Sequence, residues 1–73
     1  MQAEALKAKG NDYLTAKKYT DAIKCYTQAI ECWPSNAVYY SNRAAAYTHT
    51  QNFDEAIADC KKAVQLKPDF SKA

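Results

Sequence analysis

The sequence predicts an all-α protein made of two copies of one helix–turn–helix unit. The first observation is an internal repeat, because a shift of 34 positions aligns matching residues along the chain. The aligned pairs are Ala3 with Ala37, Tyr13 with Tyr47, Ala22 with Ala56, Ile23 with Ile57, Ala29 with Ala63 and Pro34 with Pro68. The second is composition: one Gly and two Pro in 73 residues leave little room for anything but helices and tight connections.

Apolar residues recur at helical spacing of three and four, and this predicts helices over about 3–16, 20–33, 37–50 and 54–67. Thr20 and Asp54 stand where N-caps of the second and fourth helices are expected, and Ser35-Asn36 is expected to cap the third. Pro34 and Pro68 would end the second helix of each unit. A fifth helix is expected to start near residues 69–71.

Composition argues for a binding module and against an enzyme. The net charge of +2 is too small to indicate a nucleic-acid partner, and no run of 18 apolar residues predicts a membrane span. One His and no Gly-rich loop provide no catalytic set, and no metal or other cofactor is expected. Three cysteines without metal-site spacing favour a reducing, cytoplasmic location.

Small and aromatic residues follow a fixed pattern in both units. In the first unit they are Leu6, Gly10, Tyr13, Ala22, Tyr26, Ala29 and Pro34, and in the second Tyr40, Ala44, Tyr47, Ala56, Ala63 and Pro68. This pattern resembles the tetratricopeptide repeat, with Cys60 departing from the usual aromatic. The resemblance implies a short right-handed α-solenoid: residues 1–73 as one module, repeats at about 3–36 and 37–70, and only the start of a capping helix at 71–73. The small and aromatic positions are expected to form the core.

Three segments also resemble the carboxylate-clamp tetratricopeptide domains of heat-shock co-chaperones: 6–11, 40–47 and 67–72. The resemblance implies a groove that binds the acidic C-terminal tails of 70 or 90 kilodalton heat-shock chaperones, which end Glu-Glu-Val-Asp. Carried over by motif, the peptide carboxylate would be bound by Lys7, Asn11, Asn42 and Lys72. The family's Arg, expected four residues after Lys72, falls beyond the last residue.

Apart from the resemblance, lysine and asparagine side chains suit a carboxylate ligand, because ammonium and amide groups donate charge-assisted hydrogen bonds to carboxylates. His49 is a possible groove contact. Arg43 is expected to point elsewhere and to be structural, and Trp33 to cover apolar surface. Cys32 and Cys60 are expected to be packing residues.

The alternative hypothesis is a fragment or minimal repeat scaffold without a ligand of its own. Repeat proteins normally need a terminal cap. Val64, Leu66 and Phe70 approach the end of the chain without a full helix to cover them, so this face could pair with a second copy.

Overall fold

The computed structural model describes residues 2–66. Four α-helices follow one another: α1 (Gln2–Thr15), α2 (Tyr19–Cys32), α3 (Ala37–His49) and α4 (Phe53–Leu66). Within the described range there is no strand. The number and order of the predicted helices are confirmed, and their limits differ by about one residue. The expected fifth helix, together with Pro68, Phe70 and Lys72, lies outside the described residues.

The N-caps predicted for α2 and α4 are wrong. Thr20 and Asp54 lie in the first turns of helices that already begin at Tyr19 and Phe53. The reason is the turn before each helix, where Lys17 and Gln51 both adopt φ of 65° and end the previous helix. The chain therefore re-enters the helical conformation one residue earlier than the cap pattern indicated.

The cap of α3 is confirmed. The Asn36 side chain accepts a hydrogen bond of 2.9 Å from the backbone N–H of Val38. This bond satisfies one of the donors left open at a helix start. It fixes where α3 begins after the turn that contains Pro34.

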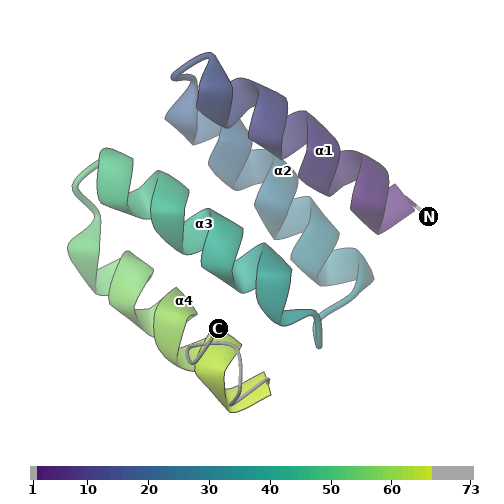
Figure 1. Ribbon diagram of the computed structural model, residues 1–73, viewed down its shortest axis with the longest axis vertical. Coiled ribbons are helices and arrows are strands. Elements are labelled where there is room, and N and C mark those ends of the chain that lie inside the picture. The colour runs from purple at the N-terminus through teal and green to yellow at the C-terminus, as the bar shows by residue number, and fades with distance from the viewer. Residues whose placement is uncertain (1, 67–73) are drawn as a thin grey trace.

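The helices form two antiparallel hairpins that stack through α2 and α3 (Figure 1). As a result α1 and α3 run parallel to each other, and they touch over a shorter stretch than α2 and α3 do. Small residues dominate the contacts: Ala22, Ala29 and Ala46 are fully buried, and the rings of Tyr26 and Tyr39 fill the space around them. The predicted core of alanines and tyrosines is thus confirmed in its main members.

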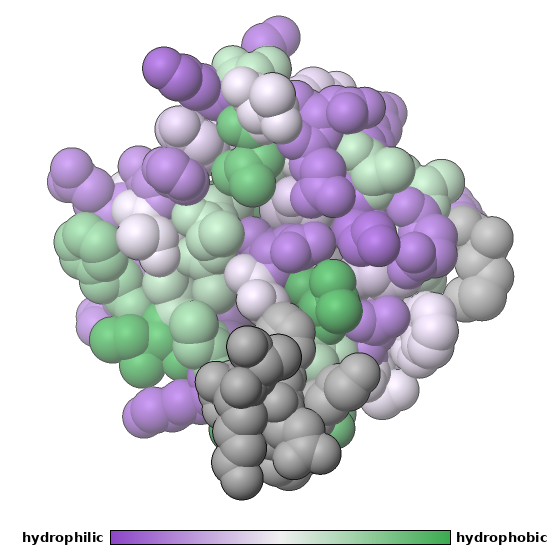
Figure 2. Space-filling view, viewed as in Figure 1, coloured by the Kyte–Doolittle hydropathy of each residue, from purple (hydrophilic) through white to green (hydrophobic). Residues whose placement is uncertain are grey.

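Some apolar positions of α4 are exposed although their α2 counterparts are half-buried or buried. Phe53, Ile57 and Val64 are 56%, 53% and 41% exposed. Figure 2 shows hydrophobic side chains gathered over α4 at the lower left. In the described chain α4 packs mainly against α3, whereas α2 has α1 on one side and α3 on the other.

The prediction that Cys32 and Cys60 are packing residues is wrong, because both are exposed and only Cys25 is buried. Cys32 is the last residue of α2, and Cys60 lies on the uncovered side of α4. Trp33 is 39% exposed and sets its ring edge-to-face with Tyr39 at 6.2 Å between centroids. No helix of the described residues has the length and apolar character needed to cross a membrane.

Candidate functional site

One face of α1 carries Glu4, Lys7 and Asn11, which follow one another at intervals of three and four residues. The Lys7 ammonium lies 3.1 Å from a carboxylate oxygen of Glu4. The Lys7 side chain keeps 28% of its surface exposed, and Asn11 is exposed as well. Two of the four predicted site residues therefore share an accessible helix face.

Asn42 lies on α3, the helix that runs parallel to α1. The hydroxyl of Tyr39, three residues before Asn42, donates a hydrogen bond to the Glu4 carboxylate and so joins α3 to α1. Helices rise about 1.5 Å per residue, so Lys7 and Asn42 each lie about 4.5 Å beyond this contact along parallel helices. Asn42 makes no side-chain hydrogen bond to the described residues and is half-buried. Lys7 and Asn42 are thus level with each other on adjacent helices.

Asn11 is held by a buried aromatic side chain. The Tyr26 hydroxyl donates a hydrogen bond to the Asn11 Oδ1 atom, while the Tyr26 ring is fully buried. The ring approaches α1 over Gly10, where an added Cβ would lie 2.6 Å from the Tyr26 Cε1 atom. Burial is also the main reason why the pKa of Tyr26 is raised, so the hydroxyl stays protonated as a donor.

The electrostatics of the α1 face centre on Glu4. Its pKa is lowered, first by the Tyr39 hydrogen bond and then by the hydrogen bond to Lys7, so this carboxylate is charged at neutral pH. Burial and then the hydrogen bond to Glu4 raise the pKa of Tyr39 to about 12. The Glu4–Lys7 pair is exposed, and exposed pairs of this kind contribute little to stability. A carboxylate ligand can therefore compete for Lys7.

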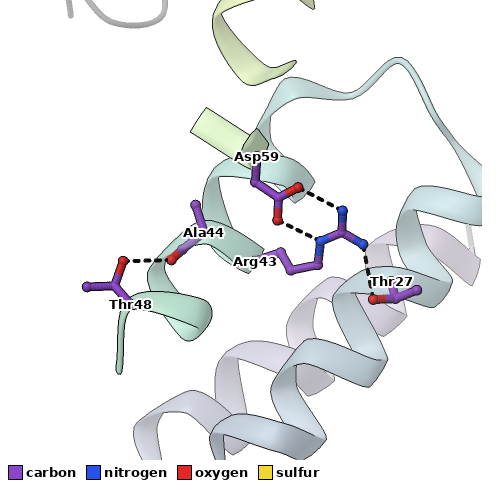
Figure 3. Close-up of polar contacts among 5 residues, drawn as sticks. All are labelled: Thr27, Arg43, Ala44, Thr48 and Asp59. Atoms are coloured by element: carbon purple, nitrogen blue, oxygen red, sulfur yellow. Dashed lines mark hydrogen bonds and ion pairs between the residues drawn. The ribbon is translucent and has the colours of Figure 1, made fainter. Parts of the chain in front are cut away.

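Arg43 is structural, as predicted from its place beside Asn42. Its guanidinium donates two hydrogen bonds of 2.7 Å to the Asp59 carboxylate on α4 and one of 3.2 Å to the Thr27 hydroxyl on α2 (Figure 3). It also lies 5.8 Å and 5.7 Å from the ring centroids of Tyr40 and Tyr47. The Asp59 hydrogen bonds raise the pKa of Arg43 further. Sequence reasoning missed Asp59, although an acidic residue inside the apolar pattern of α4 was a usable signal.

His49, the possible groove contact, stacks on Tyr19 of α2 with ring centroids 4.5 Å apart and planes 4° from parallel. The role of this residue in binding stays a prediction. Lys72 lies outside the described residues, so its place relative to α1 and α3 is a prediction too.

The donors on this face can bind an anion by hydrogen bonds and charge attraction. They are the Lys7 ammonium and the side-chain amides of Asn11 and Asn42, and carboxylates are natural ligands for such a set. The described residues contain no group of three His, Cys, Asp or Glu side chains that could hold a metal ion. We refer to the surface made by Lys7, Asn11 and Asn42 as the donor face.

The sequence matches the model of a known protein family and the sequences of known proteins. The tetratricopeptide repeat family model matches residues 3–36 and 37–70. The small glutamine-rich tetratricopeptide repeat-containing protein of Dictyostelium discoideum is 44% identical over 71 residues, which are 97% of this chain and 21% of that protein. The chain thus spans about a fifth of this relative.

Two solved structures superpose closely. The first tetratricopeptide domain of Spaghetti (RPAP3), bound to the HSP90 peptide SRMEEVD, has a TM-score of 0.94 at 42% identity and matches 97% of this chain and 56% of its own. The TPR2B-domain:pHsp70 complex of yeast Sti1 has a TM-score of 0.94 at 44% identity, over 96% of this chain and 56% of its own. With two adjacent family matches that together cover most of its length, the chain belongs to the tetratricopeptide repeat family.

Proposed function

We propose that the chain is an adaptor module that binds the acidic C-terminal tails of heat-shock chaperones of the 70 or 90 kilodalton class. The observation that supports the proposal is that Lys7, Asn11 and Asn42 lie on two adjacent parallel helices, with Lys7 and Asn42 at the same level. Relatives with peptides of both chaperone classes bound give further support. The module would comprise residues 1–73 and act in the cytoplasm, where its three free cysteines stay reduced.

The proposed roles follow from chemistry. A C-terminal Asp offers two carboxylates, and the Lys7 ammonium supplies the charge that opposes them. Asn11 and Asn42 supply directional N–H donors without adding repulsion between cations. Lys72 is proposed as a second cation, and His49 as a neighbouring contact of the peptide. Binding would involve no nucleic acid, no membrane and no cofactor.

The test is isothermal calorimetry with a peptide ending Glu-Glu-Val-Asp, once with a free C-terminal carboxylate and once amidated. We expect Lys7→Ala and Asn42→Ala each to weaken binding by about 1–3 kcal/mol, the range for losing a hydrogen bond to a charged group. Affinity should fall with rising salt and with amidation. Lys72→Ala tests the fourth residue in the same way.

Lys9→Ala is the matched control, because Lys9 is an exposed lysine of the same helix two residues after Lys7 and on a different side. The variant changes the net charge equally but leaves the donor face intact. Equal affinity for the free-acid and amidated peptides, or equal losses in Lys7→Ala and Lys9→Ala, would contradict the proposal.

Self-association is the second candidate, and the exposed side chains of Phe53, Ile57 and Val64 on α4 are the observation that favours it. Leu66 argues against it, because it is half-buried and packs against the core. Sedimentation at rising concentration decides: a monomer throughout removes this candidate, and a dimer that is broken by Ile57→Asp supports it.

A further inference from the structure

The orientation of the Asn11 amide decides whether this residue attracts or repels a carboxylate. An asparagine side chain ends in an oxygen acceptor and an N–H₂ donor, and a rotation about its last bond exchanges the two. An exposed Asn without a partner presents either end to a ligand. Only the N–H₂ end can bind a carboxylate, so a residue that fixes the amide also sets the affinity.

Tyr26 provides such a fixed partner. Its hydroxyl donates to Asn11 Oδ1, which leaves the N–H₂ group to face away from the tyrosine. The ring that carries this hydroxyl is fully buried and packs with Tyr13, Leu14 and Ile23. Because the ring has no freedom to move, the hydroxyl is a rigid anchor for a side chain that is otherwise exposed.

Gly10 makes the contact possible. An alanine Cβ at this position would lie 2.6 Å from Cε1 and 2.9 Å from Cδ1 of the Tyr26 ring, well inside normal contact distance. The absence of a side chain lets the ring approach α1 closely enough for its hydroxyl to reach the next residue, Asn11. Gly10, Asn11 and Tyr26 thus act as one group.

The second repeat offers an internal comparison. The positions 34 residues further on are Ala44, Ala45 and Cys60, so the glycine, the amide and the aromatic hydroxyl are all absent together. The α3–α4 hairpin nevertheless forms, and Ala44 is buried in it. The helical hairpin therefore does not require these three residues. Gly10 and Tyr26 belong to the repeat's pattern of small and aromatic residues, whereas Asn11 does not, so the hydrogen bond from Tyr26 to Asn11 is the part of this group that packing alone does not explain.

We infer that Tyr26 is a positioning residue of the peptide site, which holds the Asn11 amide with its N–H₂ group toward a carboxylate ligand. The inference rests on the proposed function. By this inference Tyr26, a buried residue without ligand contact, also determines the affinity for the peptide. Gly10 contributes because it lets the Tyr26 ring lie close to α1.

The test is a double-mutant cycle between Tyr26→Phe and Asn11→Ala, measured by calorimetry with the free-acid Glu-Glu-Val-Asp peptide. Tyr26→Phe keeps the ring and removes the hydroxyl. We expect its affinity to fall roughly three- to tenfold, the equivalent of one hydrogen bond. In the Asn11→Ala background the same change should have no further effect, because the amide that it orients is gone. A purely structural role of Tyr26 would reduce affinity equally in both backgrounds.

Tyr13→Phe is the matched control, since it removes a hydroxyl from the same aromatic cluster without touching Asn11. It should bind as the unchanged chain does. Circular dichroism and melting temperature show whether each variant is folded. If Tyr26→Phe loses helix content, Gly10→Ala replaces it in the cycle, because the added Cβ crowds the Tyr26 ring at 2.6 Å while the hydroxyl and Asn11 both remain, and affinity should fall only when Asn11 is present.

Unchanged affinity in a folded Tyr26→Phe or Gly10→Ala variant overturns the inference, and so does an equal loss with and without Asn11. When Lys7→Ala still weakens binding in those experiments, the proposed function survives and only the positioning role fails. When the unchanged chain does not distinguish free-acid from amidated peptide, both fail together.

Discussion

Removal of the Arg43 side chain should destabilise the protein strongly. The guanidinium is bidentate with Asp59, whose side chain is only 8% exposed, so Arg43→Ala leaves a buried carboxylate without its cation. Breaking a buried pair in this way costs about 3–5 kcal/mol. Proteins have about 0.05–0.15 kcal/mol of stability per residue, or about 4–11 kcal/mol for 73 residues. The variant should therefore lose a large share of its stability, and at the lower end of this range it would be largely unfolded at room temperature.

Asp59→Ala should cost less than Arg43→Ala. The Arg43 side chain is long and 18% exposed, so without Asp59 it can turn its charge to water, whereas the short Asp59 cannot. The double variant Arg43→Met/Asp59→Leu should recover most of the lost stability, since apolar residues replace buried pairs at little cost. Urea denaturation followed by circular dichroism gives all four free energies. A loss below about 1 kcal/mol in Arg43→Ala, or no recovery in the double variant, would refute the reasoning.

Three further predictions concern α1 and its partners. Gly10→Ala should lower stability by up to about 2 kcal/mol in urea denaturation, because the crowding against Tyr26 (about 1–3 kcal/mol) exceeds the helix-propensity gain of about 1 kcal/mol; a more stable variant would contradict this. The pKa of Tyr39 is raised to about 12 from an ordinary 10, so its contribution is complete below pH 10 and is lost as pH rises toward 12. Tyr39→Phe should accordingly lose less stability between pH 10 and 12 than the unchanged chain, and equal losses would argue against it. Glu4→Gln should tighten binding of the free-acid peptide roughly two- to fivefold in calorimetry, because it releases Lys7 and removes a nearby negative charge; weaker binding would show that Glu4 helps to orient the ammonium instead.

The helical architecture could be predicted from the sequence because the 34-residue register repeats the same small and aromatic positions. The start of α3 was predicted to the residue, but the starts of α2 and α4 were not. Lys17 and Gln51 adopt the left-handed conformation that glycine usually provides, and nothing in a lysine or a glutamine indicates this. The exposure of Cys60 could not be predicted from the sequence either, because burial at that position depends on which helix packs beside α4.

The polar contacts of the candidate site were harder to predict than its residues. Lys7, Asn11 and Asn42 were proposed from local segments and stay predictions, whereas the hydroxyl contacts of Tyr26 and Tyr39 were not predicted at all. An aromatic residue at helical spacing indicates core packing. Whether its hydroxyl donates a hydrogen bond depends on which acceptor another helix places beside it. Such contacts join residues 15 and 35 positions apart, beyond the reach of local patterns.

The three thiols differ in burial, so the rates at which they react can report how often the folded chain opens. Cys32 and Cys60 are accessible to alkylating probes, whereas Cys25 is buried within α2. A probe that reacts at once with two sites and slowly with the third would measure, through the slow phase, how often the packing around α2 opens. Because a bound peptide stabilises only the closed form, it should slow that phase in proportion to its occupancy. Ligand engagement could therefore be followed by mass spectrometry alone, without an engineered label on any helix.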